Sequence, residues 1–127
     1  MASTAQYVAT PNVGVAVIST ANANRDGTGT LGTVWTAGAS GGRVETVVIQ
    51  AIGAVTDGMV RLFVHNGTTA YLLHEEKVAA VTPSATEKAW QSLIVMSMGL
   101  VLPTGWTLRA APEKAESFNV IALGGNF

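Results

Sequence analysis

The sequence contains no cysteine, little charge and no long apolar run. Without cysteine, the chain cannot form disulfides, bind metals through thiolates or use a thiol as a nucleophile. Charged residues make up 12% of the 127 residues, about half of the usual share, whereas apolar residues make up 48%. A chain with so little charge either exposes an unusually uncharged surface or covers much of that surface with partner chains. The composition therefore favours a component of an assembly.

The few charges are nearly balanced, with seven Lys and Arg against eight Asp and Glu. No surplus of positive charge is available for phosphate backbones, so we expect no nucleic-acid partner. The N-terminus lacks the basic and apolar regions of a signal peptide. The most apolar stretch, residues 93–102, has about half of the roughly 20 residues that a membrane-spanning helix needs. We therefore expect a soluble protein made in the cytoplasm, with no membrane partner.

Short runs rich in valine and threonine alternate with clusters of Gly, Asn, Asp and Pro, which is typical of all-β proteins. We predict one antiparallel β-sandwich domain over residues 12–127, preceded by a short extended N-terminal arm at residues 1–11. About eight strands are expected. Their predicted ranges are 12–20, 30–37, 43–52, 58–65, 69–76, 90–102, 105–111 and 117–123.

Three local motifs refine this prediction. Asn66-Gly67 lies between two β runs and predicts a hairpin with a two-residue type I′ turn. Pro103 fits the second position of a later tight turn, and Gly105 fits its fourth position. Residues 84–87 (SATE) match a helix capping box. A polar loop is favoured there over a short helix, because helices below roughly 12 residues are marginal without packing.

The predicted strand at residues 43–52 is apolar on both faces, whereas an antiparallel sandwich usually has one face in water. We therefore expect its outer face to be covered, either by a loop of this chain or by a neighbouring subunit. Simple alternation predicts two faces: Glu45, Val47, Ile49 and Ala51 on one, and Val44, Thr46, Val48, Gln50 and Ile52 on the other.

In the next predicted strand, Arg61 and Phe63 point outward while their neighbours face the core. An outward aromatic residue beside an arginine is a plausible contact spot. An isolated surface aromatic is the alternative.

The polar residues offer no recognisable catalytic motif. With the predicted hairpin register, His65 and His74 lie roughly 20 Å apart and cannot share a metal. Asp26 is alone among glycines, so a turn-rich surface loop is favoured over a cation site. The sequence contains neither a Gly-x-Ser-x-Gly elbow nor a phosphate-binding loop. We expect no enzyme activity, no catalytic or metal site and no cofactor.

Five segments resemble small virion proteins of tailed bacteriophages, and the resemblance runs from about residue 20 to the C-terminus. These segments are NRDGTGT (24–30), VRLFVHNGT (60–68), TPSATE (82–87), LPTGWTLRA (102–110) and ESFNVIALGGNF (116–127). The resemblance implies a β-sandwich of the jelly-roll type that binds the outside of an icosahedral head. Such cement or decoration proteins are often trimers, and they contribute no catalytic residues.

We therefore expect a structural virion protein, a homotrimeric decoration subunit that binds the major capsid protein outside the assembled head and stabilises it. The first alternative is another phage structural protein, associated with the neck, tail or fibres. The second is a carbohydrate-binding module that stacks sugars on the tryptophans, although core packing is favoured for them. The candidate interface residues are Tyr7, Arg25, Asp26, Val48, Arg61 and Phe63.

Overall fold

The computed structural model describes residues 8–127, apart from the side chains of Ser97 and Met98, and it confirms all eight predicted strands. No strand end differs from its predicted position by more than three residues. The strands are β1 (Thr10–Ile18), β2 (Gly32–Thr36), β3 (Gly42–Ala51), β4 (Gly58–His65), β5 (Ala70–Val78), β6 (Gln91–Leu102), β7 (Thr107–Pro112) and β8 (Phe118–Asn126).

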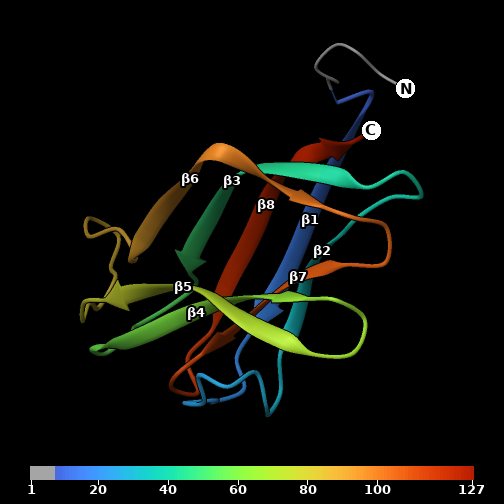
Figure 1. Ribbon diagram of the computed structural model, residues 1–127. Coiled ribbons are helices and arrows are strands. Elements are labelled where there is room, and N and C mark those ends of the chain that lie inside the picture. Colours follow the sequence, from blue (N-terminus) through green and yellow to red (C-terminus); the bar gives the residue numbers. More distant parts are fainter. Residues whose placement is uncertain (1–7) are drawn as a thin grey trace.

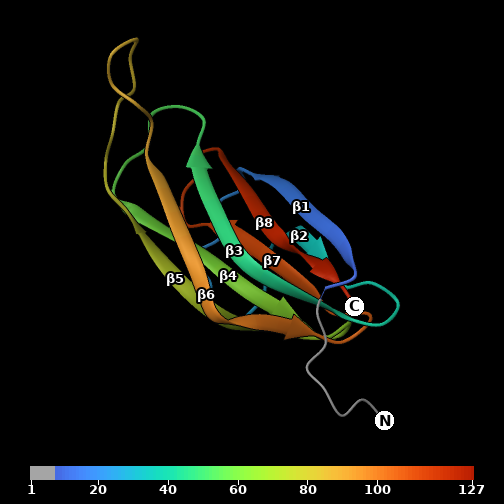
Figure 2. The same cartoon turned by 90° about the horizontal axis from the view of Figure 1, so that it is seen from above.

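The strands form two four-stranded antiparallel sheets that face each other (Figures 1 and 2). Sheet A has the strand order β1-β8-β3-β6, and sheet B has the order β2-β7-β4-β5. Each sheet combines strands from both halves of the chain. This pattern is that of a jelly roll, in which a long folded-over hairpin of strands wraps into two sheets. The predicted β-sandwich is confirmed.

The space between the sheets is filled by alternating apolar side chains. The fully buried positions come from both sheets, so neither sheet is stable without the other. Burying each of these aliphatic side chains stabilises the fold by roughly 1.5–3 kcal/mol. They include Val44, Val47, Ile49, Val60, Leu62, Leu108 and Val120, all 0% exposed.

The tryptophans belong to this core. Trp35 is buried, and its indole N–H donates a hydrogen bond to the carbonyl oxygen of Asn12 (3.0 Å). Trp90 and Trp106 pack against the core at its margin, and Trp90 meets Phe118 edge-to-face. The core packing that the sequence favoured for the tryptophans is confirmed for Trp35, and Trp90 and Trp106 are partly buried against the same core.

A β-bulge between Val44 and Thr46 interrupts β3. Opposite it, β6 turns through several extra residues, since Val44 pairs with Leu100 and Thr46 with Val95. The prediction of simple alternation along this strand is therefore wrong at its start: Val44 faces the core, and Glu45 is exposed. Beyond the bulge the alternation is as predicted.

Two predicted turns differ in detail. The β4–β5 hairpin has a four-residue loop and not a two-residue turn, since His65 pairs with Ala70. Asn66 stabilises the longer loop, because its side-chain oxygen accepts hydrogen bonds from the next backbone N–H groups, those of Thr68 and Thr69. In the later turn, the N–H of Trp106 donates to the carbonyl of Pro103, so proline occupies the first position and not the second.

The connection between β5 and β6 is a loop, as favoured from the sequence. Ser84 accepts hydrogen bonds from the N–H groups of Thr86 and Glu87, as a capping residue would, but no helix follows. At the other end of the chain, β1 begins at Thr10, within the segment predicted as an arm. Tyr7 lies outside the described residues.

Candidate functional site

Three neighbouring rows on the outer side of sheet A carry no charge, and we call this surface the A face. Beyond its first row lie Arg43 and Glu45 of β3, which form an ion pair (2.8 Å). The strand register places its side chains in three rows that cross all four strands. The first row is Val13, Leu123, Thr46 and Val95; the second is Val15, Ile121, Val48 and Leu93; the third is Val17, Asn119, Gln50 and Gln91.

The A face is open to solvent. Val15 on the edge strand β1 is 59% exposed, and Leu93 and Val95 on the opposite edge strand β6 are 61% and 66% exposed. Val48, predicted as an interface residue, lies half-buried at the centre of the face. Within residues 8–127 no loop covers this face, so the expectation of a covering loop is wrong here. The covering subunit stays a prediction.

The β1–β2 connection, residues 19–31, covers part of the outer face of sheet B, and we call it the strap; Leu72 and Lys77 of β5 remain exposed on this face. Phe63 is 0% exposed and packs with Leu31 of the strap, together with Ala70 and Ala111 of the sheet. The strap passes so close to β5 that a Cβ at Gly27 would lie 2.3 Å from the carbonyl oxygen of Ala70. Only glycine fits at this crossing.

This cover corrects the prediction for β4. Arg61 and Phe63 do lie on the outward side of the strand, but Arg61 is 3% exposed and Phe63 is 0% exposed. The prediction that these two side chains form a surface contact is wrong. The strap folds over these two side chains because its own Leu31 packs against Phe63, and this contact removes apolar surface from water.

Asn22 organises the strap from within. Its side-chain nitrogen donates to the carbonyls of Thr28 and Thr30 (both 3.0 Å), and its side-chain oxygen accepts from the N–H of Asn24 (3.0 Å). Its own N–H donates to the carbonyl of Pro112 on β7. A buried amide with these partners fixes the loop conformation. The sequence alone gave no signal that distinguished Asn22 from the neighbouring polar residues.

Two arginines tie the strap to the sheet through one carboxylate. Glu75 Oε2 accepts hydrogen bonds from Arg25 Nε (2.7 Å) and Arg61 Nε (2.8 Å). The hydrogen bond from Arg25, followed by that from Arg61, holds the pKa of Glu75 below its ordinary value. Arg25, a predicted contact residue, thus already has a partner within the chain, although its side chain is exposed.

Asp26 is exposed on the strap, as a contact residue must be. Its carboxylate accepts hydrogen bonds from the hydroxyl and the N–H of Thr28, which lower the pKa of Asp26. Both interactions lie within one turn of the strap. The Asp26 carboxylate therefore stabilises the local turn of the strap.

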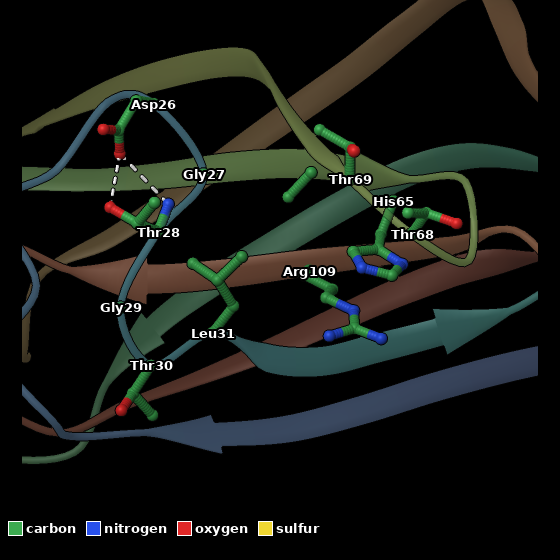
Figure 3. Close-up of a pocket in the computed structure, with 11 residues that line it drawn as sticks. Asp26, Gly27, Thr28, Gly29, Thr30, Leu31, His65, Thr68, Thr69 and Arg109 are labelled. Atoms are coloured by element: carbon green, nitrogen blue, oxygen red, sulfur yellow. Dashed lines mark hydrogen bonds between the residues drawn. The ribbon is translucent and has the colours of Figure 1, made fainter.

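A shallow pocket of about 420 Å³ opens between the strap and the β4–β5 hairpin (Figure 3). His65 and Arg109 point toward each other on one side of it, and Asp26 lies on the far side. His65 Nδ1 accepts the N–H of Gly67, so a neutral ring carries its proton on Nε2. The pocket brings His65 and Arg109 near threonine hydroxyls, and one of these hydroxyls, that of Thr28, donates to the Asp26 carboxylate within the same turn.

The two histidines lie on different faces of the hairpin. His74 pairs with Leu62 and not with Met59, so the predicted register and its separation of roughly 20 Å are wrong. Leu62 faces the core, whereas His65 lies on the outward side next to the pocket. Within residues 8–127 no group of three or more His, Asp or Glu side chains is placed to hold a metal.

A second polar cluster lies at the open edge between β5 and β6. Ser92 donates its hydroxyl hydrogen bond to Glu76, and Glu76 Oε1 lies 3.4 Å from His74 Nε2. The carboxylate stands between the serine and the imidazole. A serine nucleophile needs the imidazole itself as its base, so this order is not that of a catalytic triad.

Comparison of the chain with protein-family models, curated proteins and solved structures found no match. The resemblance to phage virion proteins therefore stays a prediction. Among residues 8–127 the structure contains no helix of the length and apolarity that crossing a membrane requires. The A face is the candidate functional site that the geometry singles out.

Proposed function

We propose that this protein is a structural subunit of a bacteriophage particle, a decoration protein on the outside of the head that binds the major capsid protein. The single observation that carries the proposal is the A face, a broad apolar surface on a small jelly-roll domain, which marks the chain as a component of an assembly. Exposed apolar patches of this kind mark interaction sites in soluble proteins. The resemblance of five segments to virion proteins supports the choice of partner.

The proposed mechanism is stabilisation by mass action. A protein that binds the assembled shell, and not its dissociated subunits, shifts the equilibrium toward the shell. Each contact can be weak, because a subunit that touches several capsid proteins, or that binds as an oligomer, gains from multivalency. This role requires a rigid domain with accessible faces and no turnover.

The test is to add the purified protein to expanded phage heads that lack their decoration protein. We expect it to sediment with the heads at a fixed stoichiometry and to raise the temperature at which they release DNA. Heads whose decoration sites are already occupied serve as the control and should bind no further copies. Failure to bind the undecorated heads, or binding without any gain in heat resistance, would contradict the proposal.

A neck, tail or fibre location is the alternative within the same class of structural proteins. A cryo-electron microscopy reconstruction of the particle distinguishes these locations by position. Density for the jelly roll on the head surface supports the proposal, and density confined to the tail overturns it.

A further inference from the structure

We infer that the A face is an interface between copies of this chain, so that the functional unit is a homo-oligomer whose subunits pack through sheet A. The resemblance already led us to expect a homotrimer; what the inference adds is the surface through which the copies pack, and it does not depend on a phage head. Its occupant is a second copy of this chain. Four observations on the surface carry it.

The first observation is where the exposed apolar side chains lie. Among the described residues, seven of the eleven large apolar side chains that are exposed lie on the outer side of sheet A, and an eighth, Ile52, directly follows the end of β3. The three others are neighbours on β5. The seven are Val13, Val15, Val17, Leu93, Val95, Val101 and Leu123. Such clustering is what an interface produces, because single exposed apolar residues are otherwise scattered.

The second observation is the absence of charge from all twelve positions of the A face. When a surface packs against its own copy, each charge meets or neighbours a charge of the same sign unless it is paired. An uncharged surface escapes this penalty. Docking onto an unrelated protein usually relies on complementary charge for orientation and speed, and the A face has none to offer.

The third observation is the chemistry of the rows. Two rows are almost wholly apolar, as in permanent homo-oligomer interfaces, which are more apolar than transient ones. The last row carries the amides of Asn119, Gln50 and Gln91. An amide is both donor and acceptor, so those of Asn119 and Gln91 can pair with the same group of a second copy, whereas Gln50 Nε2 already donates to the carbonyls of Ala51 and Trp90. The A face is therefore chemically complementary to itself.

The fourth observation is size. Four strands at about 4.8 Å and five residues at about 3.3 Å give a face of about 19 by 17 Å, or about 300 Å² in projection. A stable interface buries about 800 Å² on each partner. Ile52 and Val101 extend the apolar surface at its margins. The A face thus supplies less than half of that area, and the remainder would come from the residues around its margin.

The consequence for the proposed function is a division of the surface. An A face buried between copies leaves the strap, its pocket and the loops for contact with the shell (Figure 1). The strap carries Arg25 and Asp26 at exposed positions. The oligomer would then present several copies of this charged surface to a repeating partner.

The test uses the full chain and three variants in size-exclusion chromatography with light scattering. We expect the unmodified protein to have a mass that is a multiple of 13.1 kDa. Val15→Lys and Leu93→Lys place a charge on each edge of the A face and should shift the mass to that of one chain. Tyr71→Lys alters an equally exposed apolar residue on β5 and should leave the oligomer intact.

Circular dichroism establishes that each variant is folded, which is expected because the three side chains are more than half exposed. A single-chain mass for the unmodified protein at about 100 µM, about a hundred times the 1 µM dissociation constant of a modest complex, overturns the inference. So does an oligomer that survives both lysine variants, since its interface then lies elsewhere.

The absence of cysteine provides an independent readout. Val15→Cys and Tyr71→Cys each introduce one thiol into a chain that has no other. In a homo-oligomer, Val15→Cys should react with a thiol reagent at least about tenfold more slowly than Tyr71→Cys, because reaction depends on access. Equal rates contradict the inference. If the protein forms oligomers that do not bind phage heads, the result contradicts the proposed function but supports the inferred interface.

Discussion

The two sheets of this jelly roll have the same number of strands but opposite outer surfaces. Sheet B is partly covered by the strap, which buries Phe63 and Arg61, whereas sheet A exposes β-branched side chains on all three rows. The difference shows two ways of treating an apolar sheet face. One is partly covered by the chain itself, and the other is left for another molecule.

The largest expected effect comes from removing a side chain beneath the strap. Phe63→Ala should lower the free energy of unfolding by about 3–5 kcal/mol, because it empties a fully buried site. Leu93→Ala on the A face should lower the free energy of unfolding of the single chain by less than about 1 kcal/mol. Any further loss from a weakened interface would depend on protein concentration. Urea denaturation at several protein concentrations measures both. Equal losses would show that the two faces do not differ as described.

A pair of glycines tests how closely the strap lies on the sheet. Gly27 and Gly67 both have positive φ, but only at Gly27 would a Cβ strike the backbone of β5. Gly67→Ala should lower the free energy of unfolding by about 1–2 kcal/mol, because alanine is strained in this backbone conformation. Gly27→Ala should cost about 2–4 kcal/mol, since the strap must also move away. Thermal unfolding of the two variants decides this, and a Gly27→Ala protein as stable as Gly67→Ala would argue against close contact.

A smaller effect is expected inside the strap. Asn22→Ala leaves the carbonyls of Thr28 and Thr30 without their donor and should cost about 1–3 kcal/mol. Asn24→Ala, its exposed neighbour, should cost about 0.5 kcal/mol or less. Denaturant unfolding compares them, and the reverse order would mean that Asn22 does not organise the loop.

The smallest effect is a pH dependence confined to the strap. The pKa of Glu75 is lowered by Arg25 and Arg61, so their attachment of the strap is complete above the ordinary glutamate value of 4.5 and is lost as the pH falls through the lower folded value. Hydrogen exchange of residues 19–31, corrected for intrinsic rates, should rise in that acidic range. The exchange rates of the backbone amides in sheet A should not rise in this pH range.

Glu75→Gln is the matching variant for this experiment. It should loosen the strap at neutral pH and remove the part of the acid response that comes from Glu75. An acid response of the same size in the variant would assign the effect to other carboxylates, of which Asp26 is the nearest in the strap.

The arrangement of strands could be predicted from the sequence because it depends on local patterns. Runs of β-branched residues between glycine and asparagine clusters located every strand, and alternation located most of the core. Errors of phase occurred at two bulges, at Glu45 in β3 and at Leu73 in β5, and the two extra loop residues Thr68 and Thr69 shifted the register of the hairpin. None of these insertions changes the composition of its strand, so alternation alone does not reveal them.

The covering of the faces could not be predicted in the same way. Alternation correctly placed Phe63 on the outward side of β4, but its burial depends on where residues 19–31 pack in three dimensions. Asn22 and Gly27 decide that packing, and in sequence they look like any polar loop. For the A face, the sequence indicated that Val48 needs a cover, and the fold shows that the described chain does not supply one.

The ends of the described chain meet at one end of the sandwich. The N–H of Ala9 donates to the carbonyl of Asn126, and the N–H of Phe127 donates to the carbonyl of Gly41 (Figure 1). The strap crosses at the opposite end, as Figure 1 shows. A reporter or affinity tag fused after Phe127 would therefore begin at the end of the sandwich that lies away from the strap. The C-terminus is thus the attachment point for labels that must stay clear of residues 19–31.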